Sequence, residues 1–489
     1  MVTAGSVAAI DLGATSGRVI LGHVGHNELR LVPVARFPNL PVRTIDGLHW
    51  NILDLYRNAV AGLAAAVRED PALRSVGVDS WAVDYALLRG QRMLGNPFHY
   101  RDERSGAGVE ATKALVGAAE LYAANGLQFL PFNTLYQLGA ERLSGGLDGA
   151  DTILLIPDLM NFWLTGEKFA ERTNASTTGL LRISTGSTTG DGSTAAGWDD
   201  VLIARLQLPR EIFPELIEAG TRVGSVLPVV AAEIGVGHPL DVVAVGSHDT
   251  ASAVVAVPMH GERSAYISCG TWGLVGVELE HPVLTEESRA ANFTNEGGVD
   301  GRVRFLHNVM GLWLLSESVR VWERDGSAID LPALLAQAAD VRAPVAVFDA
   351  NDPAFLAPGD MPARIAAHCR HHGLPVAGSR PELVRSILES LADAFAKAVR
   401  VAADLSGVPI DTVHIVGGGA QNTLLCQLTA DRTGMPVFAG PVEATAIGNI
   451  LVQARAQGLA TGDLESLRGL VARSFRPTRY LPNAIPRDS

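Results

Sequence analysis

Asp249 is the residue of this sequence whose surroundings best suit acid–base chemistry. It stands in the run Gly246-Ser247-His248-Asp249-Thr250, directly after the apolar segment 242–245. A carboxylate placed there can take the proton of a hydroxyl group while that hydroxyl attacks a phosphoryl group. The same aspartate could instead cap a helix that begins near Ala251, and the residue types leave both interpretations open. His248 is interpreted as a packing or hydrogen-bonding residue rather than as a base.

Two strand–turn–strand patterns could supply phosphate-binding turns. In Val7–Gly22 and again in Ser264–Glu280, an apolar strand runs into a turn of Gly, Ser and Thr and returns as an apolar strand. Such turns gather backbone N–H groups and can bind an anion. Asp11, at the end of the first strand, could hold a Mg²⁺ ion or its water ligands, or it could only cap the turn. The repeated pattern predicts two related lobes that bind one phosphorylated ligand.

A third turn, Gly417–Asn422, would let bare backbone approach a flat ligand where a strand passes into a helix. It could equally be a permissive turn without a ligand. The glycine patterns of Rossmann dinucleotide sites and of P-loops are absent from the sequence, so neither type of site is expected.

Carboxylates alternate with aromatic residues in Val78–Tyr85. Polyols are bound by this mixture, because carboxylates accept hydroxyl hydrogens and an indole covers the C–H face of a sugar. An ordinary amphipathic strand with Trp81 in the core explains the pattern equally well.

Composition narrows the class of protein. The 489 residues are 47% apolar and 19% charged, as in a soluble globular protein of two or three domains. The net charge of −13 disfavours nucleic-acid and membrane partners. Three scattered cysteines, the lack of a targeting segment and the lack of a long apolar run predict a reducing, cytoplasmic location. A structural zinc site is not expected, because the histidines show no metal spacing; those considered are His99, His307, His368, His371 and His372.

The elements that must position these residues alternate between strands and helices, which predicts an α/β fold with helices on the faces of a sheet. Asn51 is expected to cap a helix from Ile52 to about Arg68, and a strand is expected over 151–157. Ser184–Gly197 is polar and should be a surface loop. A domain boundary is expected near Val257–Glu262. Longer helices are expected at about Pro381–Leu405, Asn422–Arg432 and Glu443–Gln457.

Several motifs together resemble the FGGY carbohydrate kinases, and among them the kinases of L-rhamnulose. The resemblance extends from about residue 7 to about residue 455. The motifs that carry it are Asp11–Arg18, Gln128–Gln137, Ser247–Ala253, Thr294–Gly298, Asn308–Leu315 and Val416–Asn422.

The resemblance implies two actin-like, ribonuclease-H-type lobes with a cleft between them. Residues 1–257 would form the sugar-binding lobe and residues 258–489 the nucleotide-binding lobe. It implies ATP-dependent phosphorylation, with Mg²⁺, of the 1-hydroxyl of L-rhamnulose in L-rhamnose breakdown. The expected partners are the ketose and ATP, and the expected assembly is a monomer or a homodimer.

The resemblance also assigns roles to individual residues. Asp249 matches the general base, and Asp11 would hold the metal, directly or through water. The positions matching substrate contacts are Ala82, His248, Asp249, Thr250 and Asn308. The positions matching nucleotide contacts are Ala14, Thr15, Ser16, Gly17, Arg18, Thr271, Ser316 and Gly419.

Two of these positions depart from the family pattern. Ala82 stands where a glycine is usual, which leaves the exact ketose open, and Ser316 stands where a glutamine is familiar. A related kinase acting on L-fuculose, L-ribulose or D-xylulose is therefore an alternative. An actin-like ATP-binding regulator that does not phosphorylate sugar is a further alternative. Asp249 discriminates between the two, because a kinase needs a base at the sugar hydroxyl and a regulator does not.

Overall fold

The computed structural model describes residues 4–183, 197–259, 261 and 263–483. The chain divides into two compact units, each assembled from segments that are distant in the sequence. Unit 1 consists of Met1–Pro258, Glu278–Phe305 and Ala444–Phe475. Unit 2 consists of Met259–Val277, Leu306–Glu443 and Arg476–Ser489. Apart from Gly197, the loop expected over Ser184–Gly197 lies outside the described residues.

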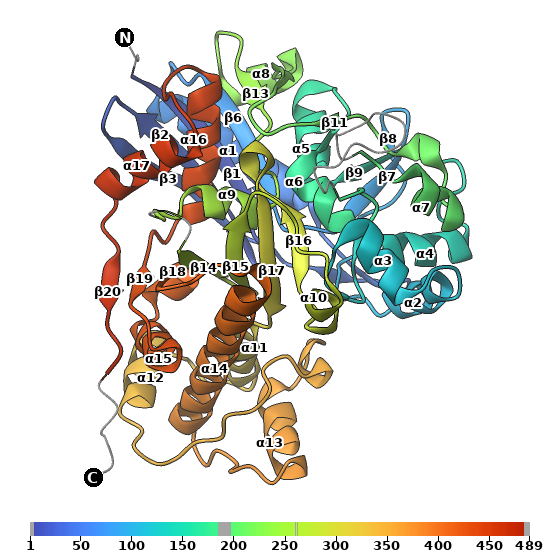
Figure 1. Ribbon diagram of the computed structural model, residues 1–489. Helices are drawn as coiled ribbons and strands as arrows, with labels where there is room; N and C mark the ends of the chain where they lie inside the picture. Colours follow the sequence, from blue (N-terminus) through green and yellow to red (C-terminus); the bar gives the residue numbers. More distant parts are fainter. Residues whose placement is uncertain (1–3, 184–196, 260, 262, 484–489) are drawn as a thin grey trace. The chain divides into compact units, whose positions relative to one another are not determined.

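The main sheet of unit 1 has the strand order β12-β13-β6-β1-β2-β3 (Figure 1). β1 pairs with β2 and β2 with β3 in antiparallel fashion, whereas β6 runs parallel to both β1 and β13. The strands of this sheet are β1 (Gly5–Leu12), β2 (Ser16–Val24), β3 (Leu29–Pro38), β6 (Ser75–Ser80), β12 (Arg222–Ser225) and β13 (Asp241–Val243).

Helices cover both faces of this sheet, because its central strands are apolar on both sides. The position of Gly62 in α1 (Ile52–Glu69) lies against Val19 of β2. On the other face, Gly22 of β2 lies against Ile450 of α16 (Ala444–Ala456). The C-terminal segment of the chain therefore completes a layer whose sheet is built from the first half.

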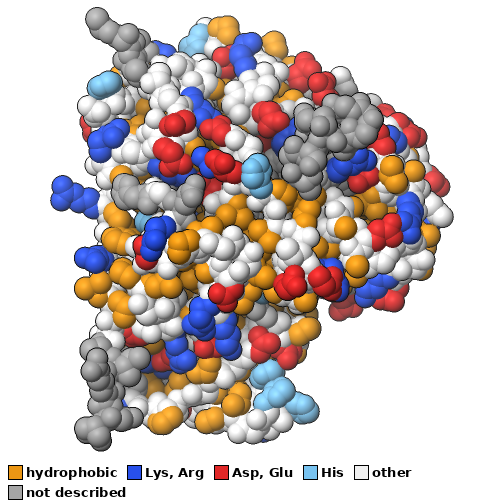
Figure 2. Space-filling view, in the orientation of Figure 1, with side chains coloured by type: hydrophobic (Ala, Val, Ile, Leu, Met, Phe, Trp, Pro, Cys, Tyr) orange, Lys and Arg blue, Asp and Glu red, His pale blue; other side chains and the backbone are white. Residues whose placement is uncertain are grey.

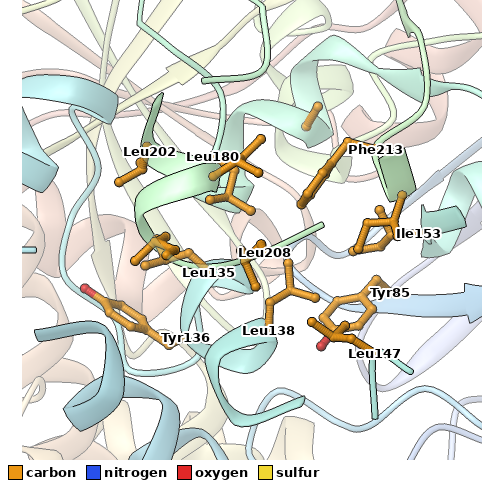
Figure 3. Close-up of a cluster of buried hydrophobic side chains, with 14 of the residues drawn as sticks. Tyr85, Leu135, Tyr136, Leu138, Leu147, Ile153, Leu180, Leu202, Leu208 and Phe213 are labelled. Atoms are coloured by element: carbon orange, nitrogen blue, oxygen red, sulfur yellow. The ribbon is translucent and has the colours of Figure 1, made fainter. Parts of the chain in front are cut away.

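The rest of unit 1 packs around a second hydrophobic cluster. Leu135, Leu180, Leu208 and Phe213 point toward one another in it (Figure 3). A small sheet in the order β8-β7-β9 borders the cluster through Tyr85. The remaining elements of unit 1 are β4 (Val42–Arg43), β5 (Leu48–His49), β7 (Tyr85–Arg89), β8 (Arg92–Met93), α2 (Ser105–Lys113), α3 (Ala118–Asn125), α4 (Thr134–Ser144), β9 (Thr152–Leu155), α5 (Ile156–Thr165), β10 (Ala170–Glu171), α6 (Arg172–Ala175), α7 (Asp200–Arg205), β11 (Leu216–Ile217), α8 (Pro228–Ile234), α9 (Asp249–Val255), α10 (Glu286–Ala290), β16 (Thr294–Gly297) and α17 (Leu464–Ser474).

The second large sheet has the order β16-β17-β15-β14-β18-β19-β20, and most of it belongs to unit 2. β14 pairs with β15 in antiparallel fashion and with β18 in parallel fashion. The elements that lie wholly or mainly in unit 2 are β14 (Ser264–Cys269), β15 (Gly273–Leu279), β17 (Val303–Val309), α11 (Trp313–Arg324), α12 (Leu331–Ala339), α13 (Met361–His371), α14 (Arg380–Ser406), β18 (Thr412–Val416), α15 (Thr423–Thr433), β19 (Val437–Ala439) and β20 (Thr478–Tyr480).

Both predicted strand–turn–strand patterns are confirmed as antiparallel hairpins, β1–β2 and β14–β15. Asn51 is the N-cap residue of α1, but its side chain makes no capping hydrogen bond. The strand expected over 151–157 ends earlier, at Leu155, because Pro157 lies in the first turn of α5, where proline needs no N–H partner. Among the described residues, none of the helices combines the length and the apolar character that crossing a membrane requires.

Candidate active site

The ends of three neighbouring segments bring carboxylates together in unit 1. Asp11 of β1 is the direct register partner of Asp79 of β6. The backbone N–H of Ser80 donates to the carbonyl of Ser247 at 2.9 Å, which places the segment leading to Asp249 beside the end of β6. Parallel strands present their carboxyl ends at one edge of a sheet, so these acids gather where α/β folds bind ligands.

Asp79 is the most deeply buried carboxylate of this group. It is fully buried, and both this burial and the charge of Asp11 raise its pKa well above the usual value. One carboxylate oxygen, Oδ2, accepts a hydrogen bond of 2.5 Å from Asn449, and the other, Oδ1, has no hydrogen-bond partner. The Nε atom of Arg18 donates to Oδ2 of Asp11 at 2.8 Å. Two adjacent carboxylates, one of which has an oxygen that accepts no hydrogen bond, form a ligand set that suits a hard divalent cation.

Asp249 is the first residue of α9, and His248 occupies the N-cap position. The alternative in which Asp249 is the N-cap is therefore wrong. The side chain of Asp249 is 30% exposed, and its Oδ1 accepts a hydrogen bond of 3.0 Å from the hydroxyl of Thr250. A partly exposed carboxylate at the start of a helix is available to an incoming hydroxyl group.

His248 connects Asp249 to a buried ion pair. Arg304, whose side chain is fully buried, donates from Nη2 to Nδ1 of His248 at 3.0 Å, and its Nη1 lies 3.2 Å from Oε2 of Glu296. Because arginine can only donate, Nδ1 of His248 must accept, and its proton belongs on Nε2. That nitrogen lies 3.5 Å from Oδ1 of Asp249. The histidine therefore orients the aspartate rather than competing with it as a base.

Glu171 is a residue of the site that the sequence did not reveal. Its Oε2 accepts hydrogen bonds from the backbone N–H and the hydroxyl of Ser247, at 3.0 and 2.7 Å, and from the hydroxyl of Thr173 at 2.6 Å. Glu171 is fully buried, and burial raises its pKa. No signal could have found it, because it is distant from Ser247 in the sequence and has no motif of its own.

The acidic and aromatic residues around Trp81 form hydrogen bonds within the protein. Asp84 is buried and accepts hydrogen bonds from Nε1 of Trp50 at 2.6 Å, from Nε1 of Trp81 at 3.0 Å and from Nε2 of Gln137 at 2.9 Å. Burial raises its pKa to about 7. Both carboxylate oxygens accept hydrogen bonds from protein groups, and through Oδ2 Asp84 positions the two indoles.

The backbone beside Ala82 is held in an unusual conformation. Val83 has φ = 69°, a left-handed value that a β-branched residue rarely adopts. Its carbonyl accepts a hydrogen bond of 2.7 Å from the hydroxyl of Thr134, and the N–H of Asp84 donates to the carbonyl of Ala82 at 2.9 Å. Strain of this kind is retained at functional sites, where the surrounding bonds enforce it.

A cavity of about 680 Å³ lies within unit 1, and Glu296 is one of its lining residues. Its polar lining also includes Asn125, Arg172, Ser176 and Asn295. Cavities of this size accommodate small ligands. The Glu296–Arg304–His248 contacts therefore join the Asp249 region to a polar space large enough for one.

The first hairpin turn carries Ala14 to Arg18. The N–H of Gly13 donates to the carbonyl of Ser16 at 3.0 Å, and the N–H of Asn39 donates to the carbonyl of Thr15 at 3.0 Å. The N–H of Gly13 is thus used inside the turn, and the second hairpin repeats this, since the N–H of Gly270 donates to the carbonyl of Trp272 at 2.8 Å. An anion at either turn must bind other N–H groups or side chains.

Unit 2 brings its own predicted residues together. The carbonyls of Gly270 and Thr271 accept hydrogen bonds of 3.0 and 3.1 Å from the N–H groups of Leu312 and Trp313, at the start of α11. Ser316 is exposed in the next turn of that helix. Asn308 lies on β17, the strand that precedes the helix in the chain. A Cβ atom added to Gly419 would strike the side chain of Cys269, so only glycine fits there.

The predicted site residues therefore form two groups, one in each unit. Unit 1 contains Asp11, Ala14, Thr15, Ser16, Gly17, Arg18, Ala82, His248, Asp249 and Thr250. Unit 2 contains Thr271, Asn308, Ser316 and Gly419. Each group gathers around strand ends of its own sheet.

Family models match nearly the whole chain. The N-terminal domain of the FGGY family of carbohydrate kinases matches residues 6–256, and its C-terminal domain matches residues 265–457. The chain thus has the two-domain organisation of sugar kinases. It belongs to the FGGY family of carbohydrate kinases.

Relatives of known name agree with this assignment. The chain is 41% identical over 485 residues to rhamnulokinase of Pectobacterium atrosepticum, covering 98% of this chain and 93% of that protein. It is 38% identical over 477 residues to rhamnulokinase of Bacteroides thetaiotaomicron, covering 97% and 95%.

Solved structures confirm the fold. Xylulose kinase from Rhodospirillum rubrum matches with a TM-score of 0.74 at 21% identity, covering 98% of this chain and 95% of that chain. Ligand-bound xylulose kinase from Lactobacillus acidophilus matches with a TM-score of 0.77 at 16% identity, covering 98% and 94%. The expected two-lobed, actin-like α/β fold is therefore confirmed. The chain is a sugar kinase, and sugar kinases of this family use ATP.

Proposed function

We propose that this chain transfers a phosphoryl group from ATP to the 1-hydroxyl of L-rhamnulose and acts in L-rhamnose catabolism. The observation that carries the choice of substrate is its likeness, over nearly the full length of both chains, to relatives named rhamnulokinase. The proposed location is the cytoplasm, which agrees with the three free, buried cysteines. The proposed assembly is a monomer or a homodimer.

In the proposed mechanism Asp249 is the general base. It takes the proton of the sugar hydroxyl as the oxygen attacks the γ-phosphorus of ATP. His248, with its proton on Nε2, holds one carboxylate oxygen and leaves the other for the substrate. Thr250, which donates to the same oxygen, supports this orientation. The proposed substrate contacts are Ala82, His248, Asp249, Thr250 and Asn308.

Nucleotide binding is assigned to both hairpin turns and to the glycine turn of unit 2. Residues 1–257 are proposed to carry the sugar side and residues 258–489 the nucleotide side. Arg18 is proposed to contact a phosphate, and the first turn positions it next to Asp11. The proposed nucleotide contacts are Ala14, Thr15, Ser16, Gly17, Arg18, Thr271, Ser316 and Gly419.

A Mg²⁺ ion is proposed to bind at Asp11, directly or through water, with Asp79 beside it. The fit rests on the buried Oδ1 of Asp79, which has no hydrogen-bond partner, and on the raised pKa caused by burial and by Asp11. When bound, the ion would neutralise charge on the phosphate oxygens. Asn449 and Arg18 keep the two carboxylates in place.

An assay of ADP release across a panel of ketoses tests the proposal. L-rhamnulose should give the highest kcat/KM, and each ADP released should be matched by one molecule of sugar phosphate. D-xylulose or L-fuculose ranking above L-rhamnulose would overturn the substrate. ADP release without sugar phosphate would instead favour the ATP-binding regulator.

A further inference from the structure

Two histidines and one aspartate gather in unit 2, away from the residues proposed for catalysis. His368 and His372 lie four residues apart at the C-terminal end of α13, so they share one side of the helix. Asp352 is the N-cap of the 3-10 helix Pro353–Phe355. One potential ligand atom from each residue lies within 4.8 Å of the other two.

The geometry of this cluster suits a metal ion. Nδ1 of His368 lies 3.3 Å from Oδ2 of Asp352, close to the separation of two ligands on one tetrahedral ion. The ring centroids of His368 and His372 are 4.4 Å apart. The side chain of His368 is only 9% exposed, and its ring packs against that of Phe355 with centroids 5.2 Å apart. One ligand is therefore held rigidly while His372 stays accessible.

The chemical types of the three ligand atoms indicate which metal ion this cluster would bind. Imidazole nitrogen suits Zn²⁺, Ni²⁺ and Co²⁺, whereas Mg²⁺ prefers an all-oxygen site such as the one around Asp11. The expectation that the histidines show no metal spacing overlooks this pair, which lies four residues apart along the chain. The third donor, Asp352, comes from a separate segment of the chain, and the sequence does not reveal it.

We propose that Asp352, His368 and His372 bind one divalent transition-metal ion of the Zn²⁺ type. Water completes the coordination, because three protein ligands leave a fourth position of a tetrahedral ion open. Figure 2 shows histidine side chains gathered at the surface in the region where Figure 1 places α13, so the ion can enter from solvent.

The ion would hold the segment 351–355 in place, and this segment forms hydrogen bonds to the motif at 308–315. Oδ1 of Asn351, next to Asp352, accepts a hydrogen bond of 3.1 Å from the N–H of Met310. The carbonyl of Phe355 accepts one of 3.0 Å from Nε1 of Trp313. Linking Asp352 to α13 therefore stabilises the backbone that carries the start of α11.

The test uses the full chain without an affinity tag, stripped with a chelator and desalted, with Zn²⁺ alone as the probe. Calorimetry and metal analysis should give one Zn²⁺ per chain with a Kd of about 1 μM or tighter. His372→Ala changes an exposed side chain and should weaken binding at least tenfold. Asp352→Asn keeps the capping oxygen and should also weaken it at least tenfold. Saturating Zn²⁺ should raise the Tm of the wild type, because binding to the folded state stabilises it.

His371→Ala is the matched control, since this exposed neighbour is outside the three-residue cluster. It should leave the Kd unchanged. The proposal is overturned if the wild type does not bind below millimolar Zn²⁺, if His372→Ala and Asp352→Asn bind as tightly as the wild type, or if His371→Ala loses binding equally. Replacing Zn²⁺ by Co²⁺ should give visible absorption that His372→Ala abolishes.

Discussion

Glu171 accepts two hydrogen bonds from Ser247, one from its backbone N–H at 3.0 Å and one from its hydroxyl at 2.7 Å. Ser247 stands two residues before Asp249, the first residue of α9, and His248 between them is the N-cap of that helix. A buried carboxylate therefore fixes the backbone that presents the proposed base. Because Glu171 is distant from Asp249 in the sequence, the fold itself determines where the base lies.

Glu171→Gln should lower kcat and the free energy of unfolding together. The amide places an NH₂ group among donors, which leaves buried groups unsatisfied and costs about 1–3 kcal/mol. The displaced Ser247 should misplace Asp249, while the KM for ATP changes little. Steady-state kinetics and urea unfolding measure the two effects. Glu167→Gln, at an exposed neighbouring glutamate, is the control and should behave as the wild type. Unchanged kcat in a destabilised Glu171→Gln would reduce Glu171 to a purely structural role.

Asp249→Asn should lower kcat by at least about 100-fold, because the variant keeps the shape and removes the proton acceptor. Nucleotide affinity and Tm should change little. The matched control is Asp200→Asn, which makes the same change at the first position of α7, on the surface. Near-normal turnover of Asp249→Asn, measured by coupled ADP release, contradicts its role as the base.

The stability of the wild type should depend on the titration of Asp84. The pKa of this carboxyl is about 7 in the folded protein, against a usual value of 3.8. Between these values the folded state holds a proton that the unfolded state has released. The free energy of unfolding should therefore fall as pH rises toward 7, by at most about 1.4 kcal/mol per unit, and then level off.

Asp84→Asn isolates this effect, because it removes the titrating group. The difference in unfolding free energy between the wild type and the variant should change from about pH 4 to about pH 7 and be constant above that. Tryptophan fluorescence is a suitable probe, since Trp50 and Trp81 both donate to Asp84. A difference that is constant across the whole range would mean that Asp84 titrates at its usual value.

Gly311→Ala should destabilise the protein and weaken nucleotide binding. Gly311 has φ = 60°, and a Cβ atom there would lie 2.6 Å from the carbonyl oxygen of Thr271. The strain and the clash should together cost about 2–5 kcal/mol. Gly326→Ala is the control: its φ of 91° is also positive, but no atom lies within 4 Å of the added Cβ. Equal losses of Tm in both variants would show that the contact with the Thr271 turn is unimportant.

The parts of the structure that the sequence predicts are those encoded by local patterns. The helix expected at Pro381–Leu405 is α14, because its apolar residues recur at helical spacing. Both hairpins follow from apolar runs around small-residue turns. The sequence also predicts the motif at 247–253, because the proposed base Asp249 and its neighbours are contiguous in the chain.

The partners of these residues were not predictable, because the sheet topology brings them in from other segments. Arg304 and Glu296 reach His248 from β17 and β16, and Asn449 reaches Asp79 from α16. The acid–aromatic pattern around Trp81 left a sugar contact and an ordinary core strand equally open, because a sequence does not show that two indoles donate hydrogen bonds to Asp84.

The position of α16 also has a consequence for how the protein is made. Gln453 on this helix donates to the carbonyl of Ala8 at 2.9 Å, and its Oε1 accepts from the hydroxyl of Ser75 at 2.7 Å, across 445 and 378 residues of chain. During translation, the face of the first sheet that α16 covers stays uncovered until the ribosome has produced almost the entire polypeptide. Nascent chains should therefore depend on chaperones over this interval, and chains released before α16 should aggregate through the uncovered face.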